Sequence, residues 1–100
     1  MCGIVGFVNN KENKDKIIKD MSKKIEHRGP DGEGFYIDDS CALAHRRLAI
    51  IDLNTGAQPI YNEDKSKVIV YNGEVYNFKE LKKALLKKKH IFKTKTDTEV

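Results

Sequence analysis

The chain has 100 residues, of which 39% are hydrophobic and 34% charged, so it is long enough for one small folded domain and does not indicate disorder. Its net charge is +4, but the lysines concentrate on one predicted helix without interleaved aromatic residues, so we interpret them as a solvated face and expect no nucleic-acid partner. Two cysteines cannot make a disulfide framework, so we expect reduced thiols and a cytoplasmic protein, and no apolar run reaches the roughly 18 residues of a membrane span.

The first predicted element is a buried strand over Ile4–Val8, directly after Met1, Cys2 and Gly3. If Met1 is removed, Cys2 carries both a thiol and a free α-amine. An ordinary thiol has a pKa of about 8.5 and an α-amine one of roughly 7.7–8.0, so the amine can act as a base for the thiol near neutral pH. The alternative is that Cys2 is a small hydrophobic residue without a role in catalysis, and the residue taken alone favours that alternative.

A helix over Asp15–Glu26 and a loop over His27–Gly34 are predicted next. Apolar residues at helical spacing mark the face of the helix that we expect to be buried: Ile17, Ile18, Met21 and Ile25. Three glycines and a proline within the eight loop residues exclude regular structure, because proline fixes φ and glycine admits positive φ. This loop is either a surface turn or a loop packed beside Cys2, and the spacing does not decide between them.

Two short strands joined by a turn follow, with predicted ranges Phe35–Ile37, Asp38–Ser40 for the turn, and Cys41–His45. Cys41 lies in an apolar stretch and is expected to be a buried thiol. Arg46 and Arg47 are predicted to lie between this strand and a third apolar run, Leu48–Ile51. Because the arginine fork binds carboxylates in bidentate fashion, one of the two arginines is a candidate for a substrate carboxylate; a surface pair is the alternative.

The next stretch contains loops over residues 54–59 and 62–67 and the predicted strand Val68–Tyr71, which runs into Asn72, Gly73 and Glu74. As a turn signal, Asn-Gly favours a type I′ hairpin. The same pair offers a side-chain amide and an approachable backbone N–H, which at the end of a strand could form an oxyanion hole.

A second helix is predicted over Phe78–Lys89, and its expected apolar face consists of Phe78, Leu81, Ala84 and Leu85. Asn77 and Glu80 have the spacing of a capping box. We expect Ile91 and Phe92 to begin another strand.

Six stretches lie in the order in which one known family carries them: Met1–Gly6, His27–Gly32, Ala44–Ile50, Gly56–Pro59, Tyr71–Asn77 and Thr96–Val100. In these stretches the chain resembles the class II glutamine amidotransferases of the N-terminal-nucleophile hydrolase superfamily, and within them the glutamine-hydrolysing asparagine synthetases. The Arg-Gly-Pro-Asp sequence separates this branch from the phosphoribosyl-pyrophosphate and glucosamine-phosphate amidotransferases. Thr96 stands where the family more often has serine.

The resemblance implies an α+β fold, the four-layer αββα sandwich, of which residues 1–100 would form about the first half. The rest of the amidotransferase domain and an ATP-using synthetase domain would then be absent from this chain. Because a short chain buries a smaller share of its surface and leaves sheet edges unpaired, we expect residues 1–100 alone to be poorly stable and inactive.

The resemblance also implies residue roles. Cys2 would attack the side-chain amide of L-glutamine and form a γ-glutamyl thioester, and the Asn72 side chain and the Gly73 N–H would hold the oxyanion. The glutamine-binding residues would be Arg47 for the α-carboxylate, Glu74 and Asp97 for the ammonium, and the pocket residues Leu48, Ala49, Ile50, Ile51, Asn72 and Gly73. Arg28 and the loop after it would support the surroundings of Cys2. No metal and no cofactor are expected in this chain; ATP and Mg²⁺ would belong to the synthetase domain.

The expected function is hydrolysis of L-glutamine to glutamate and ammonia. The ammonia would pass to a C-terminal synthetase domain of the same polypeptide, which makes asparagine from aspartate. An amidotransferase domain that serves another acceptor and a non-catalytic glutamine-binding module are the alternatives. A homodimer stays open, and a membrane is not expected as a partner.

Overall fold

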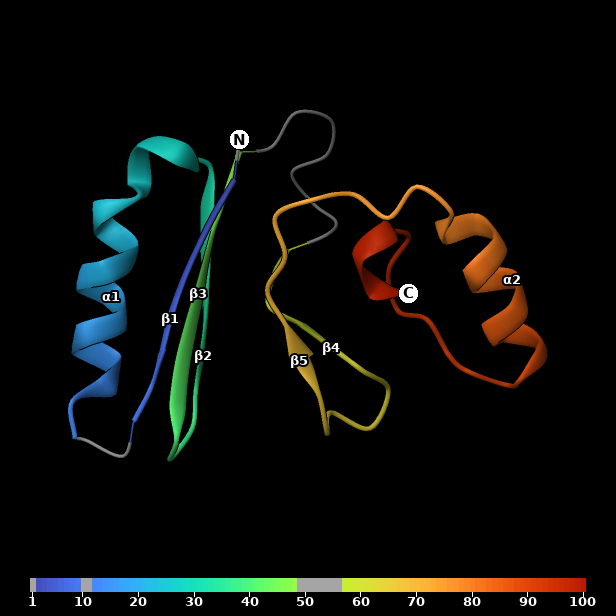
Figure 1. Ribbon diagram of the computed structural model, residues 1–100, viewed down its shortest axis with the longest axis horizontal. Coiled ribbons are helices and arrows are strands. Elements are labelled where there is room, and N and C mark those ends of the chain that lie inside the picture. Colours follow the sequence, from blue (N-terminus) through green and yellow to red (C-terminus); the bar gives the residue numbers. More distant parts are fainter. Residues whose placement is uncertain (1, 10–11, 49–56) are drawn as a thin grey trace.

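The computed structural model describes residues 2–9, 12–48 and 57–100. Its larger sheet has three antiparallel strands in the order β1–β3–β2, with bounds Gly3–Val8 for β1, Gly32–Ile37 for β2 and Cys41–Arg47 for β3. The helix α1 (Lys14–Lys24) and the 3-10 turn η1 (Glu26–Arg28) lie on one side of this sheet (Figure 1). The first predicted strand, the first helix and the turn at residues 38–40 are therefore confirmed.

Two predictions about this sheet were wrong. Arg46 and Arg47 lie within β3 and not between strands, because Arg46 pairs with Gly3 of β1 and Arg47 pairs with Gly32 of β2. The loop expected over residues 27–34 is shorter than predicted, since His27 and Arg28 belong to η1 and β2 already begins at Gly32. Pairing with β3 supplies the backbone hydrogen bonds that allow glycines to form part of a strand.

The core lies between α1 and the sheet. Ile18, Ala42 and Ala44 are fully buried there, and Val5, Phe7, Met21 and Phe35 pack around them. The buried face of α1 differs from the predicted one, because Ile17 is 38% exposed whereas Ser22 has no exposed surface. The spacing from Ile18 to Ser22 is one helical turn, so the sheet selects this stripe and turns Ile17 toward solvent. Cys41 is half-buried, less than expected, and burial raises the pKa of its thiol.

A two-stranded antiparallel hairpin, β4 (Ile60–Tyr61) and β5 (Val68–Ile69), lies on the side of the sheet away from α1 (Figure 1). The rings of Tyr36 on β2 and Tyr61 on β4 meet edge to face, with centroids 6.2 Å apart. The polar turn predicted over residues 62–67 joins the two strands, and β4 had no sequence signal because it has only two residues. Of the two interpretations of Asn72-Gly73, the type I′ hairpin is wrong, since β5 ends at Ile69 and pairs with the strand before it.

The helix α2 (Phe78–Lys87) and the 3-10 turn η2 (Asp97–Glu99) lie beyond the hairpin, so α1, the sheet, the hairpin and α2 follow one another across Figure 1. No α2 residue is buried within the part of the chain that the structure describes. On the predicted apolar face, Leu81 is 39% exposed, whereas Phe78 and Leu85 are half-buried, so this face is only partly covered. Asn77 is the residue before the helix but makes no capping hydrogen bond with its side chain. The helix ends two residues before the predicted Lys89.

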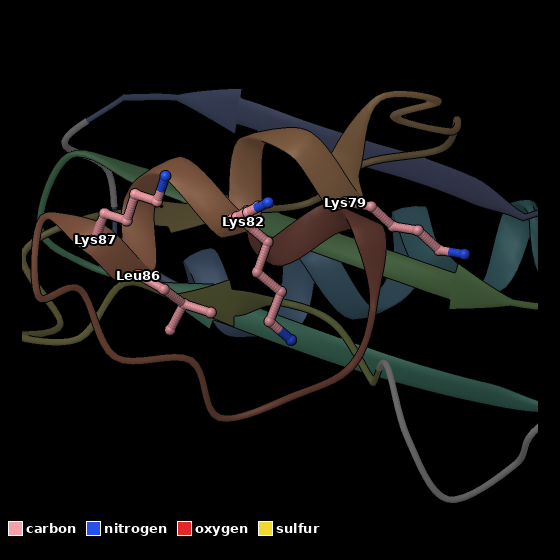
Figure 2. Close-up of a pocket in the computed structure, with 5 residues that line it drawn as sticks. Lys79, Lys82, Leu86 and Lys87 are labelled. Carbon is pink, nitrogen blue, oxygen red and sulfur yellow. The ribbon is translucent and has the colours of Figure 1, made fainter.

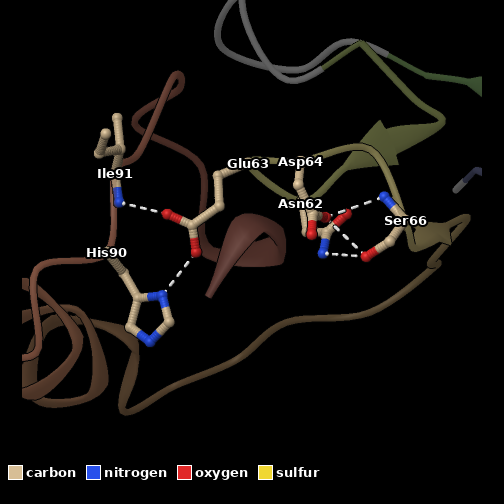
Figure 3. Close-up of polar contacts among 6 residues, drawn as sticks. All are labelled: Asn62, Glu63, Asp64, Ser66, His90 and Ile91. Carbon is tan, nitrogen blue, oxygen red and sulfur yellow. Dashed lines mark hydrogen bonds and ion pairs between the residues drawn. The ribbon is translucent and has the colours of Figure 1, made fainter.

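The strand predicted at Ile91 and Phe92 does not form. Instead, the carboxylate of Glu63 in the β4–β5 turn accepts a hydrogen bond from the Ile91 N–H at 3.0 Å and contacts His90 Nδ1 at 2.5 Å (Figure 3). The bond with His90 and the Ile91 N–H hold the pKa of the Glu63 carboxyl below its usual value. This contact ties the hairpin to the segment after α2. None of the described helices combines the length and the apolar composition needed to cross a membrane.

Candidate active site

The thiol of Cys2 lies at the end of the three-stranded sheet, beside the residue that follows β3. The Leu48 N–H donates to Cys2 Sγ at 3.4 Å, and Sγ is 3.9 Å from the Leu48 carbonyl oxygen. The antiparallel pairing of β1 with β3 produces this contact, because it brings the start of β1 to the end of β3. Cys2 is half-buried, so the residue packs against the sheet and keeps part of its surface exposed.

The main-chain carbonyl of Cys2 accepts hydrogen bonds from two other parts of the fold. Arg28 Nε, in η1, donates to this oxygen at 3.3 Å, which confirms the expectation that Arg28 supports the surroundings of Cys2. Asn72 Nδ2, in the segment after β5, donates to the same oxygen at 2.9 Å. A carboxamide has two N–H donors, so Asn72 keeps a second donor beside Cys2.

Of the two acidic residues of the predicted set, Asp97 contacts the segment after Asn72 that carries the other, Glu74. Asp97 Oδ2 accepts a hydrogen bond from the Val75 N–H at 2.7 Å, next to Glu74. The Tyr71 hydroxyl donates to the Glu74 carbonyl oxygen at 3.4 Å, and the Tyr71 ring occupies the space where a side chain at Gly73 would lie. Within the described ranges, no hydrogen bond joins Gly73, Glu74 or Asp97 to Cys2.

The structure distinguishes between the two adjacent arginines. Successive residues of a strand point to opposite faces. Arg46 lies on the α1 side, is only 7% exposed, and forms ion pairs with Glu33 at 2.5 Å and with Glu26 at 3.3 Å. Its charge is therefore used inside the fold. Arg47 lies on the opposite face of β3 with His45.

Arg47 and His45 line a small cavity of about 120 Å³ between the three-stranded sheet and the second layer, which is the β4–β5 hairpin with the residues that flank it. The other residues that line the cavity are Asp31, Gly32, Glu33, Ala57 and Gln58. His45 is 3% exposed. Burial and the charge of Arg47 lower its pKa, and a hydrogen bond to the backbone of Tyr71 opposes them. The lowered pKa favours the neutral form of the His45 imidazole.

Of the predicted pocket residues Leu48–Ile51, the structure describes Leu48, which is half-buried beside Cys2. Ala49, Ile50 and Ile51 lie outside the described residues. Sequence reasoning missed Gln58, whose side chain holds the backbone of Tyr71, and it missed His45 as well. Alternation along β3 places His45 on the face of Arg47, whereas no local pattern indicates the role of Gln58.

Two other observations bear on the location of the site. A depression of about 470 Å³ beside α2 is lined by Lys79, Lys82, Lys83, Leu86 and Lys87 (Figure 2). It offers neither a nucleophile nor a carboxylate, and α2 lies on the far side of the molecule from α1 (Figure 1), so we do not assign the chemistry to it. Among the residues that the structure describes, no group of three or more histidine, cysteine or acidic side chains could hold a metal ion.

A family model described as the glutamine amidotransferase domain matches residues 1–100. Asparagine synthetase (glutamine-hydrolyzing) 3 of Arabidopsis thaliana is 47% identical over an alignment that covers 100% of this chain and 18% of that protein. The asparagine synthetase (glutamine-hydrolyzing) of Zea mays is 48% identical, with 100% of this chain and 17% of that protein covered. Asparagine synthetase (glutamine-hydrolyzing) 2 of Bacillus subtilis (strain 168) is 47% identical, with 100% and 14% covered. The chain thus spans less than a fifth of the length of these curated relatives.

Proposed function

Because this chain belongs to the glutamine amidotransferase domain family, we propose that Cys2 is the nucleophile of a glutaminase that converts L-glutamine to glutamate and ammonia. The observation that carries the proposal is the position of Cys2. Its sulfur lies 3.4 Å from the Leu48 N–H, and the amide of Asn72 reaches the same residue from the second layer. A thiol on a rigid sheet with an amide donor beside it has the parts needed for acyl transfer.

The proposed reaction starts from Cys2 with a free α-amine, after removal of Met1. Cys2 Sγ attacks the side-chain carbonyl carbon of glutamine, a C–S bond forms, and the thiol proton passes to the α-amine. The second N–H of Asn72 and the backbone N–H of Gly73 stabilise the resulting oxyanion. The C–N bond then breaks, and the ammonia that leaves takes the proton from the α-ammonium. Water attacks the γ-glutamyl thioester, the C–S bond breaks, and glutamate and the thiol are released.

The backbone end of glutamine is a zwitterion, so its binding site needs one cation and at least one carboxylate set apart from it. We assign the α-carboxylate to Arg47 and the α-ammonium to Glu74 and Asp97. Arg47 faces away from α1, and Asp97 is held against the segment after Asn72 by its bond to the Val75 N–H. Leu48, together with Ala49, Ile50 and Ile51, would line the pocket for the side chain.

For the whole protein we propose the four-layer αββα fold, which the order of α1, the sheet, the hairpin and α2 supports (Figure 1). The printed names of the relatives support an asparagine synthetase in which ammonia from glutamine reaches aspartate. Because these relatives are named asparagine synthetases, we place ATP and Mg²⁺ in the synthetase domain. Two free thiols favour the cytoplasm.

The test uses the full-length protein, with Met1 shown to be absent by intact mass. Supplied with L-glutamine, aspartate, ATP and Mg²⁺, it should form equal amounts of glutamate and asparagine, measured by mass spectrometry. Formation of glutamate without asparagine would support the glutaminase but show that the ammonia acceptor is not aspartate, as in an amidotransferase that serves another acceptor. Absence of both products would refute the proposal and leave a glutamine-binding module.

A further inference from the structure

The side chain of Gln58 binds the backbone of Tyr71 with both ends of its carboxamide. Gln58 Nε2 donates to the Tyr71 carbonyl oxygen at 2.9 Å, and the Tyr71 N–H donates to Gln58 Oε1 at 2.5 Å. These are the two bonds that a neighbouring strand would make with a residue in a ladder. The carboxamide therefore takes the place of a partner strand where the chain has already left β5, which ends at Ile69.

This contact lies one residue from the site. Tyr71 directly precedes Asn72, whose Nδ2 donates to the Cys2 carbonyl oxygen at 2.9 Å. Asn72 itself is exposed and belongs to no helix or strand, so elements of regular structure do not determine its position. The hydrogen bonds of Gln58 to the preceding residue supply that restraint.

Gln58 is in turn fixed against the three-stranded sheet. A Cβ at Gly34 of β2 would overlap the Gln58 carbonyl oxygen and lie 2.9 Å from Pro59 Cδ, so the backbone at residues 58–59 rests directly on β2. Gly34 pairs with His45 of β3, and His45 lines the same small cavity as Gln58. The sheet that carries Cys2 thus supports the residue whose side chain holds Tyr71.

We propose that Gln58 is a positioning residue for the glutaminase reaction, which acts by holding Tyr71 so that the amide of Asn72 lies at Cys2. The inference rests on the proposed function of this site. It predicts that loss of the Gln58 hydrogen bonds slows the chemical step through Asn72, while glutamine binding by Arg47 and the acidic residues changes little.

The experiment compares Gln58→Met with the parent in the full-length protein, because methionine has a similar length but cannot form either bond. Glutaminase kcat should fall about tenfold to a hundredfold, a part of the effect of losing an oxyanion donor, and KM for glutamine should change by less than about threefold. Asn62→Ala is the matched control, because the Asn62 carboxamide also binds backbone, accepting from the Lys67 N–H at 2.8 Å in the β4–β5 turn. This control should keep the parental kcat.

A double-mutant cycle separates positioning from a loss of stability. In an Asn72→Ala background, Gln58→Met should lower kcat by less than about twofold, since the donor it positions is gone. Equal losses in both backgrounds would overturn the inference and leave the glutaminase intact. Hydrogen exchange adds a readout independent of activity, because the Tyr71 N–H should exchange faster in Gln58→Met. Unchanged exchange would also overturn the inference. A parent protein that hydrolyses no glutamine would refute the proposed function and this inference together.

Discussion

Asn72 Nδ2 lies 2.9 Å from the main-chain carbonyl oxygen of Cys2, although 70 residues separate them in the chain. Cys2 precedes the first strand of the larger sheet, whereas Asn72 follows the hairpin of the second layer. The site therefore forms only when the two layers are packed together, and changes that alter this packing should affect catalysis as well as stability.

Replacement of the nucleophile gives the first prediction. In the full-length protein, Cys2→Ala should lower glutamine hydrolysis by roughly a thousandfold or more, because it removes the thiol that forms the thioester. Asparagine formation from added ammonium salts should persist, since ammonia bypasses the thiol. Both rates can be followed by mass spectrometry of glutamate and asparagine. Glutaminase activity within tenfold of the parent would contradict the role of Cys2.

Asn72→Ala tests the oxyanion donor. Removing one such donor should lower kcat by about a hundredfold to a thousandfold with little change in KM, because the bond strengthens only in the transition state. Asn77→Ala is the matched control: Asn77 is exposed and makes no capping bond, so its loss should leave kcat unchanged. A large rise in KM for Asn72→Ala at constant kcat would instead indicate a binding role.

Parallel substitutions of the two arginines should have different effects. Arg47→Lys should raise KM for glutamine roughly tenfold through loss of the bidentate fork, with little change in thermal stability. Arg46→Lys should lower the unfolding temperature instead, because Arg46 joins Glu26 and Glu33. Glutamine kinetics and differential scanning calorimetry on both variants measure this contrast. An effect of Arg46→Lys on KM with stability unchanged would reverse the assignment.

Gly34→Ala should disturb both the fold and the site. The added Cβ would overlap the Gln58 backbone, which we expect to lower the free energy of unfolding by about 1–3 kcal/mol and to lower glutaminase kcat. Gly32→Ala, on the same strand, places its Cβ no closer than 3.8 Å to a neighbouring atom and serves as the control. Denaturant unfolding and kinetics should show a loss for Gly34→Ala alone; equal losses for both variants would contradict the contact with Gln58.

Asp38 gives a prediction about pH. Its carboxylate accepts hydrogen bonds from the Tyr36 hydroxyl, the Ser40 N–H and the Cys41 N–H, each at 2.8 Å, and these bonds hold the Asp38 pKa well below its usual range. A pKa lower in the folded than in the unfolded protein means stabilisation that is complete above the unfolded value of about 3.9 and lost as pH falls further.

Asp38→Asn should therefore lower the unfolding temperature at pH 7, and the difference from the parent should shrink below about pH 4. Asp39→Asn is the control, because Asp39 is exposed and makes no hydrogen bond in the part of the chain that the structure describes. The measurement is thermal unfolding monitored by circular dichroism between pH 3 and pH 7. This range includes the ordinary pKa of an aspartate. A difference that stays constant over this range would contradict the ionic role of Asp38.

Local patterns in the sequence were sufficient to predict β1, α1, α2 and the turn at residues 38–40. Hydrophobic periodicity and turn residues are signals that depend only on residues close together in the sequence. The order of the six motifs was sufficient to identify the family, which the match over residues 1–100 confirms. Cys2 could be identified as a candidate nucleophile from the sequence, because the proposed chemistry depends on its position next to Met1.

Only the tertiary structure decided the remaining features, because each depends on a partner distant in the sequence. Pairing with β1 and β2 extends β3 through Arg46 and Arg47, and their alternation assigns Arg46 to ion pairs. The surface of the sheet determines that Ser22, and not Ile17, is buried. Gln58 can hold Tyr71 only because the fold places the two residues side by side. In the same way, Asn72 can donate to Cys2 only because the fold brings it there. The sequence determines which side chain stands at each position, but the packing of the layers determines which distant residue that side chain contacts.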